Sequence, residues 1–161
     1  MKTLARSILL GGVLAVAPLS SALAVDELNV SVGYSVVGKP LAMHGYDPVA
    51  YFTVGRPTQG SDSLVYVHDG AAYRFVSQQN LDAFKANPAR YVPAYGGFCA
   101  YGVALGKKFD GDPDLWKIVD GKLYLNLNEE IQSKWSQDIA GNIRKANSQW
   151  QSIASRPANT L

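Results

Sequence analysis

The chain contains a single cysteine, Cys99, and this scarcity excludes a disulfide bond within one molecule. It also contains only two histidines, His44 and His68, so a metal site made of three histidines is impossible. We find no Ser-His-Asp pattern, no phosphate-binding glycine loop and no paired-acid motif. These absences argue against hydrolases and nucleotide-dependent enzymes. Cys99 is then the main candidate for a reactive residue in this chain.

Long hydrophobic runs are absent beyond the first residues, whereas a membrane-spanning helix needs about 20 apolar residues. We therefore expect no membrane insertion. The start of the chain has the features of a secretory signal peptide: Lys2 and Arg6, an apolar run at 8–18, and the small-residue cleavage site Ala22-Leu23-Ala24. The sequence predicts a cleaved signal at 1–24, a mature start at Val25 and a periplasmic or secreted protein.

An excess of charge of one sign is also missing. Removal of the signal takes away Lys2 and Arg6, which leaves thirteen basic residues against thirteen acidic ones. A nucleic-acid-binding surface needs a basic stripe, and this balance argues against one.

Two segments resemble each other at a spacing of 51 residues. In each, a β-prone run leads to an Asp-Gly turn, at 69–70 and at 120–121, and then to a second β-prone run and a helix cap, Ser77 or Asn128. The pattern predicts two hairpins, each followed by a helix. A real duplication and a coincidental similarity both explain it.

The remaining periodicity predicts an N-terminal arm or edge strand at 25–40, a short strand from Val49 to Val54 and a helix from Gln78 to Ala86. A further helix is expected from Phe98 to Leu105. The last helix is expected to run unbroken from Glu129 to Trp150, because apolar residues recur there every three or four positions. Residues 154–161 are expected to form a flexible tail. The predicted fold is therefore a single α+β domain at 41–153, with short antiparallel hairpins, two or three helices, one core and a long C-terminal helix.

Three segments together carry a family resemblance that spans about residues 40–150. They are Gly45-Tyr46-Asp47-Pro48-Val49-Ala50-Tyr51-Phe52, Tyr95-Gly96-Gly97-Phe98-Cys99-Ala100-Tyr101 and Asp120-Gly121-Lys122-Leu123-Tyr124-Leu125-Asn126. With these segments the chain resembles the exported YHS-domain proteins. Some members of that group carry selenocysteine at the place that corresponds to Cys99, which implies a reactive atom there.

The resemblance departs from the broader YHS family at the metal site. That family is associated with metal handling through cysteines, and the corresponding positions here are Ala50, Val76 and Asn80. Because all three thiols are missing, the resemblance implies the fold more strongly than the metal site. Any metal site in this chain has to be built around Cys99.

The candidate metal ligands are Cys99, His44, Met43 and Asp47, a set that suits a copper or zinc ion. Alternatively, His44 is an exposed loop imidazole and Asp47 caps its own turn. Cys99 is either a reactive thiolate, activated by the N–H groups of a following helix, or a buried packing residue. Tyr46, Tyr51, Tyr95, Phe98 and Tyr101 either line a pocket beside Cys99 or belong to the core.

Three functions remain open at this stage. The first is soft-metal binding of the copper type through Cys99. The second is a thiol redox protein, which would act on a thiol partner protein through a sulfenic acid or a mixed disulfide, because no second cysteine exists in the chain. The third is a non-catalytic interaction domain that binds another protein or a second copy of the chain.

Overall fold

The computed structural model describes residues 26–30, 33 and 35–161. The expected signal peptide at 1–24, and Val25, Val32 and Tyr34 of the expected arm, lie outside these residues. The described chain consists of two antiparallel β-hairpins and the helices that pack against them, which confirms the predicted α+β class. Within this part of the chain, no helix is both long enough and apolar enough to cross a membrane.

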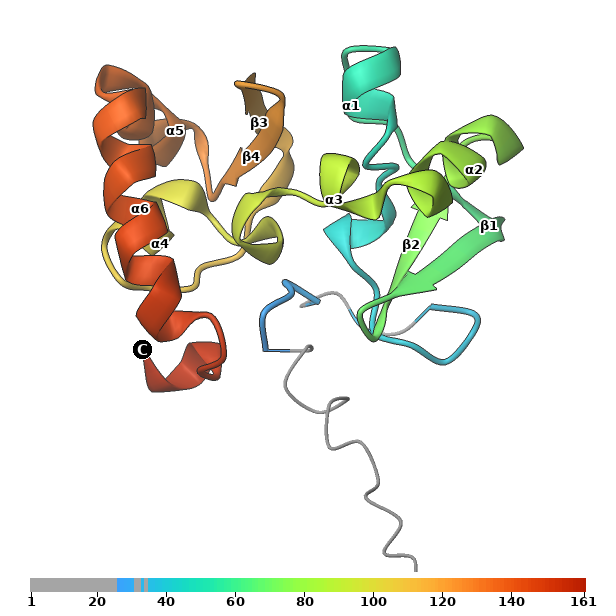
Figure 1. The fold of residues 1–161 in the computed structure, drawn as a ribbon, viewed down its shortest axis with the longest axis horizontal. Coiled ribbons are helices and arrows are strands. Elements are labelled where there is room, and N and C mark those ends of the chain that lie inside the picture. The colour runs from blue at the N-terminus through green and yellow to red at the C-terminus, as the bar shows by residue number, and fades with distance from the viewer. Residues whose placement is uncertain (1–25, 31–32, 34) are drawn as a thin grey trace, which may run out of the picture.

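The elements form two consecutive series of the same order, which occupy the two halves of the molecule in Figure 1. We name residues 41–91 the first repeat and residues 92–153 the second repeat. The first contains the 3-10 turn η1 (Met43–Gly45), α1 (Ala50–Thr53), β1 (Ser61–His68), β2 (Ala71–Phe75), α2 (Gln78–Ala86) and α3 (Pro88–Tyr91). The second contains η2 (Ala94–Gly97), α4 (Ala100–Ala104), β3 (Asp112–Val119), β4 (Lys122–Asn126), α5 (Glu129–Gln137) and α6 (Ile139–Ile153), and a final 3-10 turn, η3 (Ala158–Thr160), follows.

The correspondence between the repeats extends to details of the backbone. From the hairpins onward, equivalent residues lie 51 positions apart. In the preceding turn the residues with positive φ, 43–45 and 95–97, lie 52 apart, and the short helices α1 and α4 begin 50 apart. The turn residues Asp69 and Asp120 have φ of 48° and 49°. Both hairpins also shift register at the same place, in the first half of the first strand. The similarity found in the sequence is therefore a structural repeat.

The predicted helix caps are confirmed in both repeats. The Ser77 side chain accepts a hydrogen bond from the N–H of Asn80, and the Asn128 side chain accepts one from the N–H of Ile131. Each bond satisfies one of the N–H groups that a helix leaves free in its first turn. Helix α2 occupies the predicted range and ends before Asn87 and Pro88.

The predicted strand from Val49 to Val54 is wrong, because this segment forms helix α1. The carboxylate of Asp47 accepts hydrogen bonds from the N–H groups of Val49 and Ala50 at the start of the helix. Pro48 fits there as well, because its φ suits a first helical turn and it has no N–H to leave unsatisfied. A short apolar run does not distinguish a buried strand from a helix turn, and here the acceptor before it decides.

The unbroken helix expected from Glu129 to Trp150 is also wrong, since the chain breaks at Asp138 between α5 and α6. Asp138 has φ −146° and ψ 71°, and its carboxylate accepts a hydrogen bond from the N–H of Gly141 at 2.9 Å. A Cβ atom at position 141 would lie 1.9 Å from Asp138 Oδ2. The glycine in the middle of the expected helix is therefore required by the cap that begins a new one.

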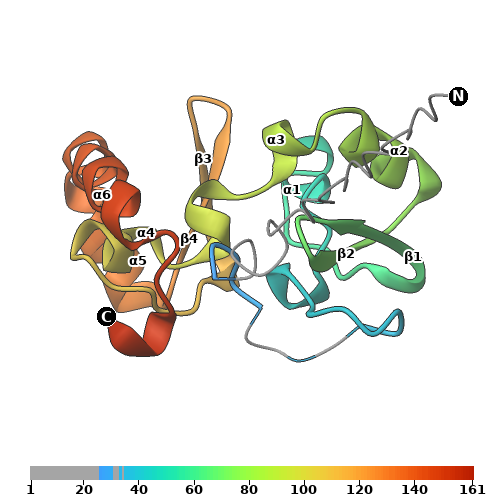
Figure 2. The ribbon, with the colours of Figure 1, turned by 60° about the horizontal axis from the view of Figure 1, so that its bottom comes forward.

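The apolar residues form two clusters instead of the single expected core. Tyr73, Phe75 and Phe84 belong to the first cluster, and the buried Trp135 belongs to the second. Strand β4 serves both, because Leu123 and Leu125 join the first cluster whereas Tyr124, on the opposite face, joins the second. In Figure 2 the second hairpin accordingly stands between the first repeat and the C-terminal helices.

Both ends of the described chain are attached to the second repeat. The described residues of the expected arm contain no strand, but the N–H of Asn29 donates to the carbonyl of Gly96 at 2.9 Å. The buried Lys108 ammonium donates to the carbonyls of Asp26, Ala154 and Arg156 at 2.7, 2.6 and 2.5 Å. The segment at 154–161, expected to be a flexible tail, therefore contains the turn η3 and a direct contact to Lys108.

Candidate functional site

Cys99 is the N-cap residue of the short helix α4. The N–H of Gly102 donates to its sulfur at 3.4 Å, as expected for a thiol placed at the start of a helix. Its own N–H donates to the carbonyl of Phe109 at 2.9 Å. The residue is 0% exposed, however, so solvent does not reach the sulfur in this conformation.

The surroundings of the sulfur favour the neutral thiol form over the thiolate. Burial raises the pKa of the Cys99 thiol, although the N–H groups of Gly102, Leu127 and Tyr101 act in the opposite direction. The thiol lies 3.8 Å from Oδ1 of Asn126, which also accepts a hydrogen bond from the N–H of Tyr101. A thiol that donates a hydrogen bond and has a raised pKa is a poor nucleophile at neutral pH.

Asp47 occupies in the first repeat the place that Cys99 occupies in the second. The N–H of Asp47 donates to the carbonyl of Thr58 at 2.9 Å, as the N–H of Cys99 does to Phe109. The carboxylate is fully buried. It accepts from the N–H groups of Val49, Ala50 and Val76 and from the side-chain amide of Asn80.

Three of these partners stand where the family resemblance expects thiols: Ala50, Val76 and Asn80. The fold does bring the three positions together, around the Asp47 carboxylate. In this chain their contacts to it are two backbone N–H groups and one amide, in place of sulfur ligands. The four donors use the hydrogen-bonding capacity of both carboxylate oxygens.

His44 connects the two repeats. Its Nε2 lies 2.8 Å from Oδ1 of Asp110, and the same oxygen accepts a hydrogen bond from the side-chain amide of Asn29 at 2.5 Å. The hydrogen bond to Asp110 raises the pKa of His44, burial lowers it, and the charges of Asp110 and Asp112 raise it further. The imidazole is thus a partner of a carboxylate and is not the free loop side chain of the alternative interpretation.

The other candidate ligands have separate positions. Met43 is buried in the first hydrophobic cluster. The second histidine, His68, which is not a candidate ligand, lies 3.1 Å from Oδ2 of its neighbour Asp69. Among the residues that the structure describes, no three His, Cys, Asp or Glu side chains meet in a group that could hold a metal ion.

The aromatic residues predicted to line a pocket are distributed over the molecule. The Tyr51 hydroxyl donates to the carbonyl of Pro113 at 2.9 Å, and the Tyr95 hydroxyl donates to Asn147 at 2.9 Å. Phe98 and Tyr101 pack in the second cluster, whereas Tyr46 forms a backbone bridge with Gln59. Their packing and hydroxyl partners correspond to the alternative of core residues.

A pocket of about 180 Å³ lies between the repeats, and the Cys99 side chain does not line it. Its walls come from the N-terminal segment, the turn of the first hairpin, the start of the second repeat as far as η2, and helix α6. The lining residues are Glu27, Leu28, Asp69, Val92, Gly96 and Trp150.

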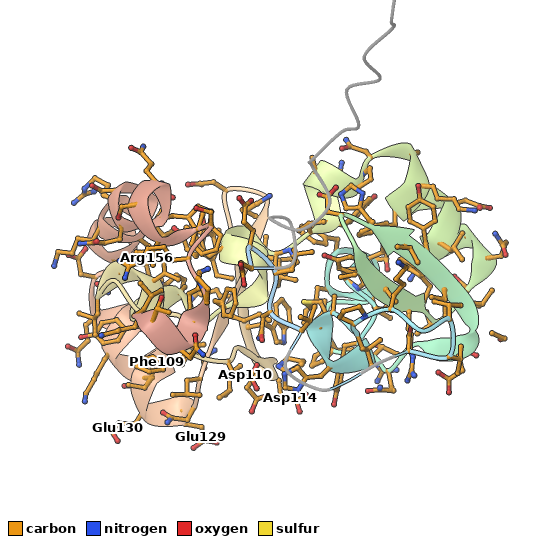
Figure 3. The ribbon with its side chains drawn as sticks, turned by 90° about the horizontal axis from the view of Figure 1, so that it is seen from below. Phe109, Asp110, Asp114, Glu129, Glu130 and Arg156 are labelled. Atoms are coloured by element: carbon orange, nitrogen blue, oxygen red, sulfur yellow. The ribbon has the colours of Figure 1, made fainter. Side chains whose placement is uncertain are left out.

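Sequence reasoning missed Lys108 and a group of acidic residues beside the exposed Phe109. Asp110, Asp112 and Asp114 alternate along the start of the second hairpin, and Glu129 and Glu130 begin α5. Figure 3 shows Phe109, Asp110, Asp114, Glu129 and Glu130 along one side of the second repeat. The alternating aspartates were a visible signal, but their proximity to Glu129 depends on the strand pairing.

Comparison of the chain with known protein families, with curated proteins and with solved structures found no match.

Proposed function

We propose that this chain is a non-catalytic protein-interaction domain that acts outside the cytoplasm, with Cys99 as a structural helix cap. The observation that carries the proposal is the setting of the sulfur: it is 0% exposed and bonded within its own repeat. Export rests on the signal-peptide pattern of the sequence.

The setting of Cys99 favours this proposal over thiol redox chemistry. A redox thiol has to reach a partner or an oxidant as thiolate, which requires exposure and a depressed pKa. Here burial raises the pKa of Cys99.

The environments of the other candidate ligands favour it over copper-type binding. A soft metal ion would need ligands with free lone pairs around the sulfur. Asp47 is engaged by four donors, and the Nε2 of His44 is engaged by Asp110. Binding an ion through these residues would require breaking several of these contacts. The copper proposal therefore stands as the rival that an experiment has to eliminate.

A test of the proposal uses the chain from Val25 onward and a Cys99→Ser variant as its control. We expect the thiol to react with a disulfide reagent at least about a hundredfold more slowly in the native protein than in urea, because reaction has to await opening of the structure. We also expect Cu(I), titrated against a competing chelator, to bind both proteins equally.

Two results would overturn the proposal. One is a native thiol that reacts as fast as the unfolded one. The other is a stoichiometric Cu(I) site that the Cys99→Ser variant lacks, which would establish the copper-type function in its place.

A further inference from the structure

Two exposed apolar side chains flank the open end of the second hairpin, one on each of its two chain segments. Phe109 is 46% exposed and precedes β3, and Leu127 is 37% exposed and follows β4. The pairing of Asp112 with Asn126 brings these two chain segments together. Acidic residues surround them on both segments. We name this set the aromatic-acidic surface: Phe109, Leu127, Asp110, Asp112, Asp114, Glu129 and Glu130.

The first repeat keeps an exposed apolar residue, Val76, at the position of Leu127, but it shows that the fold does not need the rest of this surface. At the equivalent position it has Thr58 in place of Phe109, and at the positions of the five acids it has only neutral polar residues: Gln59, Ser61, Ser63, Gln78 and Gln79. The one acid in the equivalent stretch, Asp62, forms an ion pair with Arg74. The same backbone therefore forms with and without the acidic residues.

The local hydrogen bonds lead to the same conclusion. In the second repeat the N–H of Asp114 donates to the Asp112 carboxylate, and in the first repeat the N–H of Ser63 donates to the Ser61 hydroxyl. A hydroxyl is thus sufficient for this turn. The negative charges are a property of the second repeat that local structure does not demand.

The charge on this side is concentrated and only partly compensated. Five of the thirteen acidic residues of the chain belong to the surface. Asp110 faces His44, and Glu130 pairs with the exposed Lys134. Asp114 and Glu129 are exposed, and the nearest exposed cations along the chain are Lys107, two residues before Phe109, and Lys117, three residues after Asp114. The sum of these charges is negative in a protein whose mature chain is neutral.

We infer that the aromatic-acidic surface binds a segment of another protein in which Lys or Arg residues stand beside an apolar side chain. Phe109 and Leu127 offer apolar contact area, and the carboxylates attract Lys or Arg side chains and set the orientation of the partner. The same charges disfavour nucleic acid and anionic membranes. They also disfavour a second copy, because a two-fold interface would place like charges opposite each other. The inference rests on the proposed interaction function and names its site and partner class.

The test uses the chain from Val25 onward and a short fluorescent peptide of lysine, arginine and leucine. A lysine-glycine peptide of the same charge and a glutamate-leucine peptide serve as controls. The main variant transfers the neutral residues of the first repeat to the second: Asp112→Ser, Asp114→Ser, Glu129→Gln and Glu130→Gln. Asp110 is left unchanged because it holds His44 and Asn29. A matched variant also removes four acids, all away from the surface, by Glu27→Gln, Asp69→Asn, Asp82→Ser and Asp120→Asn.

We expect the lysine-leucine peptide to bind the natural chain and to bind the main variant about tenfold more weakly or worse, with the matched variant unchanged within about twofold. Raising the salt concentration weakens this binding. Phe109→Thr reduces the preference for the leucine peptide over the glycine peptide. Amide shifts on peptide addition are expected at 109–114 and 127–130. Thermal unfolding of each variant shows whether it is folded.

The inference is overturned if the main variant binds the peptide as tightly as the natural chain, or if the amide shifts map to another face. Neither result affects the proposed function, because that proposal is tested by thiol reactivity and copper titration. Conversely, an exposed reactive thiol would overturn the proposed function, whereas the peptide experiment would still show whether this surface binds a basic segment.

Discussion

The two repeats share a backbone but differ in the residue that caps their first helix. Asp47 in the first repeat receives four hydrogen bonds in a fully buried site, whereas Cys99 in the second receives a weaker bond from Gly102. In both repeats the side chain at this position accepts a hydrogen bond from an N–H group at the start of the helix. This position needs an acceptor for the first N–H groups, and sulfur is a weak one.

The largest expected effect tests this difference in capping. Asp47→Ala leaves three backbone N–H groups and the Asn80 amide without their acceptor, and we expect it to lower the free energy of unfolding by about 4 kcal/mol. Cys99→Ala is expected to cost only about 1–2 kcal/mol, because it removes one small buried side chain and weak bonds. Urea unfolding followed by tryptophan fluorescence measures both. Equal losses would show that the two caps do equivalent work.

The next comparison concerns Lys108, whose equivalent in the first repeat is Pro57. Lys108→Met removes three charge-assisted hydrogen bonds from partly buried carbonyls, and we expect a loss of about 3 kcal/mol. Hydrogen exchange should accelerate at 26–30 and 154–161 in particular. The exposed Lys107→Met is the control and should leave both quantities unchanged. If the amides at 26–30 and 154–161 stayed protected from hydrogen exchange in Lys108→Met, packing and not the ammonium group would hold the two segments in place.

A third comparison uses the break between the last two helices of each repeat. Asp138 caps Gly141, whereas Asn87 makes no side-chain cap and Arg90 stands in the place of Gly141. Gly141→Ala should therefore destabilise the protein by about 2 kcal/mol, although helix propensity alone predicts a gain of about 1 kcal/mol. Thermal unfolding measures the sign. The double variant Asp138→Ala with Gly141→Ala should be more stable than Gly141→Ala alone.

The smallest effect concerns the contact between the repeats. The pKa of His44 is raised in the folded protein, so its stabilising contribution is complete below the unfolded value of about 6.5 and is lost as pH rises through the folded value. We expect a change of about 1 kcal/mol or less, since both side chains are partly exposed. Asp110→Asn should flatten this part of the stability curve, and His68→Gln should not. Urea unfolding across this pH range provides the measurement.

The features that the sequence predicted correctly are local ones. The Asp-Gly turns, the caps Ser77 and Asn128 and the range of α2 each follow from a few neighbouring residues. The two errors in the predicted helices and strands, at 49–54 and at Asp138, were also local in origin. The segment after Asp47 was too short to show a period, and the cap at Asp138 interrupts an apolar stripe whose spacing continues across the break.

The candidate site was harder to predict because its contacts join distant parts of the chain. His44 meets Asp110 across 66 residues, and Lys108 meets Asp26 across 82. Contacts between residues so far apart leave no periodic pattern in the sequence. The surroundings of Cys99 were half predicted: the helix N–H beside the sulfur was expected, but its complete burial depends on Asn126 and on packing around α4.

The single ammonium group of Lys108 gathers carbonyls from both ends of the described chain, which places Asp26 within a few ångströms of Ala154 and Arg156. The ends can accordingly be joined by a short glycine linker without disturbing either repeat. New termini opened at the exposed turn between β1 and β2 would then give a circularly permuted protein with the same fold. In such a protein the second repeat lies between the two parts of the first repeat along the chain, while the arrangement of the elements in space does not change.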